Sequence, residues 1–101
     1  MALKLRLDRQ AVSDLRAIRT YLLAEAGPAA ADRVRDHLRK RLERLRNNPG
    51  IGVMTSERAI RILPRTRYPY RIYYTIAHEA VVILHIRHSA RHDPDFGNLS
   101  S

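Results

Sequence analysis

The chain begins with a strict alternation of apolar and charged residues. Leu3, Leu5 and Leu7 are separated by Lys4 and Arg6, which is the period of a strand with one buried face. The next residue, an aspartate at position 8, is a suitable N-cap for a helix. The pattern predicts a strand over residues 3–7 and a helix directly after it.

Two helical segments follow, each with apolar residues at steps of three and four positions. The stripes consist of Ala11, Leu15, Ile18 and Leu22, and of Ala31, Val34, Leu38, Leu42 and Leu45. Such spacing predicts amphipathic helices. Gly27 suits a helix end and Pro28 suits a first turn, so we expect a tight antiparallel helical hairpin that closes at residues 47–50.

The second half of the chain changes to patterns typical of strands. The expected strands span about residues 58–63, 70–76 and 80–87. We expect a loop over residues 51–57, with Gly50 and Gly52 as flexible points, and a turn region over residues 64–69. Residues 88–101 are expected to form an irregular tail.

The element order β-α-α-β-β-β predicts an α+β fold. A helical hairpin would cover one face of an antiparallel sheet. With 101 residues, the chain fits a single domain, residues 1–101, whose tail becomes irregular from about residue 93.

Strand parity divides the predicted sheet into a helix-facing side and an outer face. We assign the even positions of residues 70–76 and 81–88 to the core, because Tyr70, Ile72, Tyr74 and Ile76 are the apolar set of the first of these strands. Ile60 and Ile62 are also assigned to the core. The outer face then gathers Arg61, Arg71, Tyr73, His85 and Arg87.

Charge gives the first indication of function. Nineteen Lys and Arg residues, seventeen of them Arg, outnumber ten Asp and Glu, and the net charge is +9. Guanidinium groups bind phosphates and carboxylates in a bidentate manner, so we expect an anionic partner, either nucleic acid or an acidic protein. The predicted outer face fits a nucleic-acid backbone. The alternative is an open sheet face covered by long polar side chains.

Several function classes are disfavoured. The chain has no cysteine, so it has neither disulfides nor a thiolate metal site. It has no apolar run long enough for a signal peptide or a membrane span, and we expect a soluble, cytoplasmic protein. No phosphate-binding loop or nucleophile motif points to a cofactor or to covalent catalysis.

The histidines leave two interpretations open. On a strand, His85 and His88 point to opposite faces, so we expect no metal site. His88 and His92 lie beside Arg91 near the strand end and are candidate acid–base groups. The alternative is that they are hydrogen-bonded structural residues.

Four segments in order carry a resemblance to a known family. They are residues 11–22 (AVSDLRAIRTYL), 48–52 (NPGIG), 68–74 (YPYRIYY) and 83–91 (ILHIRHSAR). Over residues 3–92 the chain resembles the RelE/ParE superfamily of bacterial toxins. The resemblance implies the toxin half of a type II toxin–antitoxin pair, with an antitoxin partner that is acidic, partly disordered and wraps the toxin.

The superfamily has two activities, and the resemblance implies different residues for each. RelE-like members cleave messenger RNA in the ribosome; Arg71 and Arg91 match their functional arginines, and Arg61 lies near a functional lysine. Two further features of that pattern are missing, because Leu63 stands near the position of a second lysine and Phe96 stands near a tyrosine. An RNase would therefore have to recruit His88 or His92.

ParE-like members poison DNA gyrase and need no catalytic residues of their own. The segments 68–71 and 88–91 resemble that branch more closely. We therefore predict a gyrase-poisoning toxin, which would not be an enzyme. The alternative is a ribosome-dependent endoribonuclease, and a third hypothesis is a non-catalytic nucleic-acid-binding module.

Overall fold

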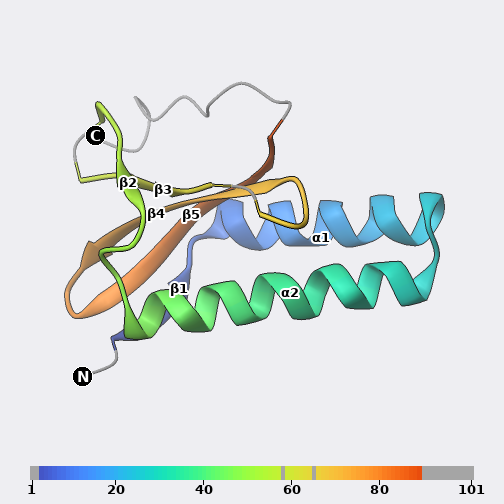
Figure 1. The fold of residues 1–101 in the computed structure, drawn as a ribbon, viewed down its shortest axis with the longest axis horizontal. Helices are drawn as coiled ribbons and strands as arrows, with labels where there is room; N and C mark the ends of the chain where they lie inside the picture. The colour runs from blue at the N-terminus through green and yellow to red at the C-terminus, as the bar shows by residue number, and fades with distance from the viewer. Residues whose placement is uncertain (1–2, 58, 65, 90–101) are drawn as a thin grey trace.

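The computed structural model describes residues 3–57, 59–64 and 66–89. Two helices and five strands follow one another along the chain (Figure 1). The elements are β1 (Lys4–Leu7), α1 (Arg9–Glu25), α2 (Pro28–Asn47), β2 (Val53–Met54), β3 (Arg61–Leu63), β4 (Tyr70–Ala77) and β5 (Ala80–His88). The α+β fold and the helical hairpin are confirmed. The predicted loop over residues 51–57 contains one short additional strand, β2.

The five strands form one sheet in the order β1-β5-β4-β3-β2. β3, β4 and β5 pair antiparallel, as expected, and the additional strand β2 pairs antiparallel with β3. β1 pairs with β5 in parallel, so the sheet is mixed. The two helices that separate β1 from the other strands allow this arrangement, because a parallel pair needs a long connection.

The helices lie side by side and antiparallel in Figure 1, with the sheet packed against them. Gly27 has a φ of 90° and Pro28 is the first residue of α2, which explains the abrupt turn between the helices. Asp8 occupies the N-cap position of α1, but its side chain makes no capping bond. Its backbone N–H donates to the carbonyl of Ile83 instead (2.8 Å).

The main core lies between the helices and the sheet. Its buried members are Ala11, Val34, Leu38, Leu42, Leu45, Tyr70, Ile72, Tyr74, Val81, Ile83 and Ile86. Arg41 is also buried; its guanidinium donates to the carbonyl oxygens of Tyr70 (3.1 Å) and Pro64. Burial lowers the pKa of Arg41. This arginine fixes α2 to the segment that leads into β4.

Simple strand parity is wrong for part of the sheet, and a β-bulge is the reason. Tyr73 pairs with His85 and Tyr74 with Ile83, so Leu84 is an extra residue in β5. One inserted residue exchanges the two faces on either side of it. Val81 and Ile83 therefore face the helices although they are odd-numbered. Ile76 pairs with Val81 and lies on the same face, but it is near the end of β4 and 40% exposed, so the prediction that it is buried is wrong.

The predicted faces of residues 60–62, in and beside β3, are wrong as well. Ile62 pairs with Tyr73, and both Ile60 and Ile62 pack with Tyr73 in a small cluster separate from the main core. Arg61 pairs with Tyr74, which belongs to the main core. The register thus places Arg61, and neither isoleucine, on the helix-facing side.

In the described part of the chain, no helix is apolar enough over a sufficient length to span a membrane.

Candidate functional site

Four of the five residues predicted for the outer face do lie together. Arg71 pairs with Arg87, and Tyr73 pairs with His85 two positions further along the ladder. The guanidinium of Arg71 lies 5.9 Å from the centre of the Tyr73 ring and donates to the carbonyl of Ser89 (3.2 Å). The β4 and β5 strands therefore present two arginines beside each other.

The same face also has an apolar half, which strand parity did not predict. Tyr73 and Ile60 are buried there, and Ile62 and Leu84 pack against them. Val53 on β2 continues the row beside Ile62 and is 65% exposed. Because Tyr73 has no exposed surface, its ring is not available to stack on a base, and the prediction of a polar, base-stacking face is wrong at this residue.

His85 is held at the edge of this face by α1. The Nδ1 atom of His85 lies 3.7 Å from Oδ2 of Asp14, and the same oxygen accepts the backbone N–H of Ile86 (2.9 Å). Burial lowers the pKa of His85, Asp14 opposes this shift, and nearby Arg87 adds to it. Burial thus favours the neutral imidazole.

Asp14 is a residue that sequence reasoning missed. Asp14 directly precedes Leu15, which belongs to the apolar stripe of α1. A carboxylate so close to that stripe was the one feature of the sequence that could have indicated a partly buried acidic side chain. The structure explains its place: β1 ends opposite Ile83, and beyond this point the Asp14 carboxylate takes over a β5 N–H group that a longer β1 could have paired.

Arg61 and His88 do not join the outer-face cluster. Arg61 donates to the carbonyls of Gly52 (3.0 Å) and Gly50 (3.4 Å), and His88 contacts the ring of Tyr70 edge-on at 5.7 Å. Arg91 and His92 lie outside the described residues. The described candidates for an RNase site, Arg61, Arg71 and His88, are therefore divided between two sides of the sheet.

The predicted flexibility of Gly52 is also wrong. Its N–H donates to the Tyr74 hydroxyl (2.8 Å), and this hydroxyl donates to the carbonyl of Pro49 (2.7 Å). A Cβ at Gly52 would lie 2.5 Å from the same oxygen. Burial raises the pKa of Tyr74, while the Gly52 bond and Arg61 oppose this shift. The glycine is required for close approach, and the bonds fix the start of β2.

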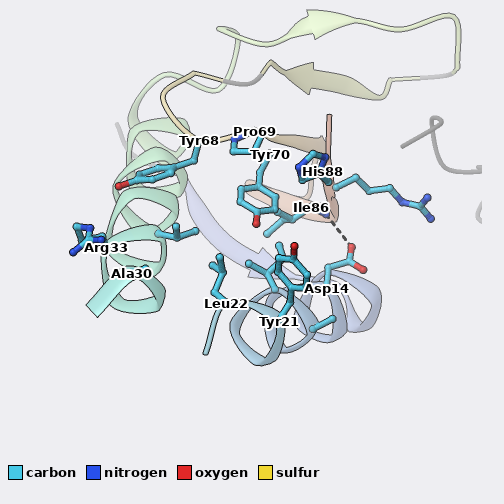
Figure 2. A pocket seen from close by; sticks show the side chains of 14 residues that line it. Asp14, Tyr21, Leu22, Ala30, Arg33, Tyr68, Pro69, Tyr70, Ile86 and His88 are labelled. Carbon is cyan, nitrogen blue, oxygen red and sulfur yellow. Dashed lines mark hydrogen bonds between the residues drawn. The ribbon is translucent and has the colours of Figure 1, made fainter. Parts of the chain in front are cut away.

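A groove on the helix-facing side, called here the tyrosine groove, opens beside the end of β5. Its volume is about 570 Å³. Figure 2 shows Tyr21 from α1 and Tyr70 from β4 with their hydroxyls turned toward the same space, and Tyr68 beside Arg33 on the α2 side. Burial raises the pKa of Tyr70. Asp14 also lines this groove, so one carboxylate borders both the groove and His85.

The described residues contain no cluster of three or more His, Cys, Asp or Glu side chains that could hold a metal ion. The described part of the chain presents two surfaces suited to binding: paired arginines beside an apolar patch on the outer face, and an aromatic groove between the helices and β5.

Comparisons with known proteins agree with this fold. A structure from the chromosomal ParDE toxin–antitoxin system of P. aeruginosa superimposes with a TM-score of 0.77 at 24% identity, covering 86% of this chain and 96% of that one. The intact E. coli RelBE toxin–antitoxin complex gives a TM-score of 0.64 at 20% identity over 89% and 100% of the two chains. The isolated E. coli RelE toxin gives 0.65 at 19% over 91% and 89%. No curated protein sequence matches significantly.

These likenesses establish that the chain shares the fold of these structures. The family model for the ParE toxin of the type II toxin–antitoxin system, parDE, matches residues 5–93. The chain belongs to this ParE toxin family and is the toxin component of a type II toxin–antitoxin pair.

Proposed function

We propose that this toxin inhibits growth by poisoning DNA gyrase, and that it binds its target through the outer face of the sheet. The observation that carries the proposal is the division of that face into an apolar half around Ile62 and Leu84 and a basic half with Arg71 and Arg87. An apolar centre flanked by arginines is typical of protein interfaces. The arginines are also suited to phosphates of gyrase-bound DNA.

The distribution of the RNase candidates supports the same choice. Cleavage of a phosphodiester needs an acid–base pair and a charge-stabilising group around one phosphate. Arg71 is on the outer face, whereas Arg61 contacts glycine carbonyls and His88 lines the tyrosine groove. A poison that acts through surface contacts needs no such convergence. Because gyrase acts on DNA in the cytoplasm, the proposal also places the toxin there.

The partner proposed for neutralisation is an acidic antitoxin that is partly disordered until it binds. The net charge of +9 favours an acidic partner, and a disordered chain can wrap a small toxin over a large surface.

Assays of gyrase-held DNA breaks and of messenger RNA cleavage distinguish the two toxin activities. We expect the purified toxin to increase the DNA breaks that gyrase holds, and induced cells to show these breaks within minutes while their messages stay intact. Replacing Arg71 and Arg87 by alanine should lower the trapping of cleaved DNA about tenfold or more, because hot-spot arginines contribute about 2 kcal/mol each.

The control carries alanine at Arg9 and Arg44. Both are exposed arginines on the helices, away from the outer face, and removing them changes the net charge equally. Its gyrase trapping should match the wild type. Codon-linked message cleavage with normal DNA would contradict the proposal and identify an endoribonuclease instead.

A further inference from the structure

Cationic side chains gather where α2 passes the segment that precedes β4. Arg33, His37 and Lys40 are spaced by four and three residues, so they lie on one stripe of α2. The stripe meets the segment before β4 where His37 lies 3.1 Å from the hydroxyl of Thr66. Arg67 is the next residue, and Arg33, Lys40 and Arg67 are all exposed. We call Arg33, His37, Lys40 and Arg67 the α2 cationic cluster.

Tyr68 supports the cluster from the β4 side. Its ring contacts the His37 imidazole edge-on, with ring centres 4.9 Å apart, and the Arg67 guanidinium lies 5.6 Å from the centre of the same ring. In Figure 2, Tyr68 lies beside Arg33 on the α2 side of the tyrosine groove. Two segments that are far apart in the sequence therefore bring their cations to one surface.

The carboxylates of α2 do not neutralise this cluster. Asp32 pairs with Arg19 of α1 (3.2 Å), and Asp36 pairs with Arg35 (3.3 Å) and Arg39 (3.5 Å). Within residues 3–57, 59–64 and 66–89, no carboxylate forms an ion pair with a member of the α2 cationic cluster. The cluster therefore leaves an excess of positive charge on this surface.

His37 responds to that charge. Burial lowers its pKa, and the positive charges of Arg41, Arg67 and Lys40 lower it further. An anion bound among these cations would oppose the second effect, because an opposite charge favours the protonated imidazole. His37 is thus placed to report on an anion at the cluster.

The spacing and composition of the cluster fit a phosphate backbone better than a protein surface. Arg33 and Lys40 are about 10 Å apart along the helix axis, which is about the axial rise of three phosphates on one DNA strand. Protein interfaces are built around an apolar centre, whereas all four members of the cluster carry nitrogen donors and none is apolar. Such side chains bind phosphates without reading the bases.

We propose that the α2 cationic cluster binds the phosphate backbone of duplex DNA, independently of base sequence. The choice of DNA over RNA rests on the proposed function, since gyrase holds duplex DNA, but the binding itself does not require gyrase. Arg71 and Arg87 lie on the outer face of the sheet, whereas α2 covers the other face. The cluster is therefore a second DNA contact, separate from the proposed target-binding face.

Fluorescence anisotropy with a short labelled DNA duplex tests the proposal in the absence of gyrase. The triple variant Arg33→Gln, Lys40→Gln and Arg67→Gln should bind about 10- to 100-fold more weakly than the wild type at low salt. Its plot of log affinity against log salt concentration should be shallower by about three, because each lost phosphate contact lowers the slope by about one.

The matched control carries Arg6→Gln, Arg9→Gln and Arg16→Gln. These are exposed positions on β1 and α1, and their replacement removes the same net charge. Because the control leaves the cluster intact, its salt slope should equal that of the wild type. Its affinity should fall by less than about threefold, since distant surface charges are screened.

The imidazole resonances of the wild type give a second measurement that needs no variant. Addition of the duplex should raise the pKa of His37, because phosphates offset the cations around it. His78 in the β4–β5 turn is exposed and serves as the internal control. Its resonances should stay unchanged.

The opposite results would overturn the proposal. These are a duplex that the wild type does not bind, equal losses in the triple variant and the control, or a His37 that does not respond. Tighter binding of an RNA duplex would overturn the choice of DNA, and poly-glutamate that binds as tightly as the duplex would assign the cluster to an acidic protein. A wild-type toxin that binds the duplex but traps no gyrase-cleaved DNA would contradict only the proposed function.

Discussion

The two faces of the same sheet are built on different principles. On the helix side, eleven buried residues from both helices and strands form one continuous core. On the outer face, a small cluster has Ile60 and Tyr73 as its buried members, with Ile62 and Leu84 packed against them, and two arginines lie at their side. The helices cover one face, whereas the described elements place no second layer on the other.

This difference separates the apolar residues that the fold requires from those that it only tolerates. A core residue is constrained by close packing on all sides. A partly exposed apolar residue on an open face adds less stability, and a contiguous patch of such residues is the pattern expected of the proposed binding surface. The strands that supply the arginines are packed against the core behind them, so the proposed target would meet a well-supported surface.

The largest expected effect comes from the core. Leu45 has no exposed surface, and Leu45→Ala should lower the free energy of unfolding by about 2–5 kcal/mol through lost burial and a remaining cavity. Ile62→Ala on the outer face should lower it by about 1 kcal/mol, because Ile62 is only partly buried. Urea unfolding measures both values. Equal losses would mean that the outer cluster is a second core rather than a binding surface.

A smaller effect is expected at Asp14, which connects the faces. Asp14→Ala leaves the Ile86 N–H without its acceptor, and this should cost about 1–3 kcal/mol in the same measurement. Asp14→Asn retains an acceptor oxygen and should recover most of the loss. Asp36→Ala removes only exposed ion pairs and should cost less than about 1 kcal/mol. If the Asn variant were no better than Ala, the hydrogen bond would not be the cause.

The β4–β5 turn offers a gain of stability that affects both faces equally. His78 and Glu79 have φ values of 50° and 62°, and a two-residue turn with both φ positive favours Asn followed by Gly. The double substitution His78→Asn and Glu79→Gly should raise the free energy of unfolding by about 1 kcal/mol, because it relieves the left-handed backbone of its side-chain crowding. Thermal melting that shows no increase would indicate that the turn is not strained.

The smallest effect is the contribution of His85 to the pH dependence of stability. Because burial lowers the pKa of His85, the unfolded chain binds a proton at this residue more readily than the folded chain. Stability should therefore fall as the pH drops below the ordinary histidine pKa of 6.5. The pKa of His37 is lowered as well, chiefly by burial, so part of the slope belongs to it.

His85→Gln should reduce that slope between about pH 7 and 5 without removing it, since the window lies around the histidine pKa. Melting temperatures at several pH values measure the difference between variant and wild type. An unchanged slope would show that the pKa of His85 is the same in the folded and the unfolded chain. The contact between His85 and Asp14 would then contribute nothing to the pH dependence of stability.

The sequence alone determined both helices, four of the five strands and the buried side of each helix; the short strand β2 was not predicted. Periods of two and of about 3.6 residues follow from backbone geometry, so Leu3–Leu7 and the stripes of both helices were predictable. The surplus of arginine predicted an anionic partner. Arg71, Tyr73, His85 and Arg87 were placed on one face correctly because they share a register on two strands.

Only the tertiary structure decided the contents of the outer face. A bulge at Leu84 inverts the parity of β5, and nothing in an uninterrupted run of apolar residues marks where one residue is inserted. The pairing of β3 sends Ile60 and Ile62 outward and Arg61 to the glycine carbonyls. Burial of Arg41 and the contact of Gly52 with Tyr74 depend on chain segments far apart in the sequence. Local periodicity reports which positions are apolar, but the side that buries them depends on register, which is set by long-range packing.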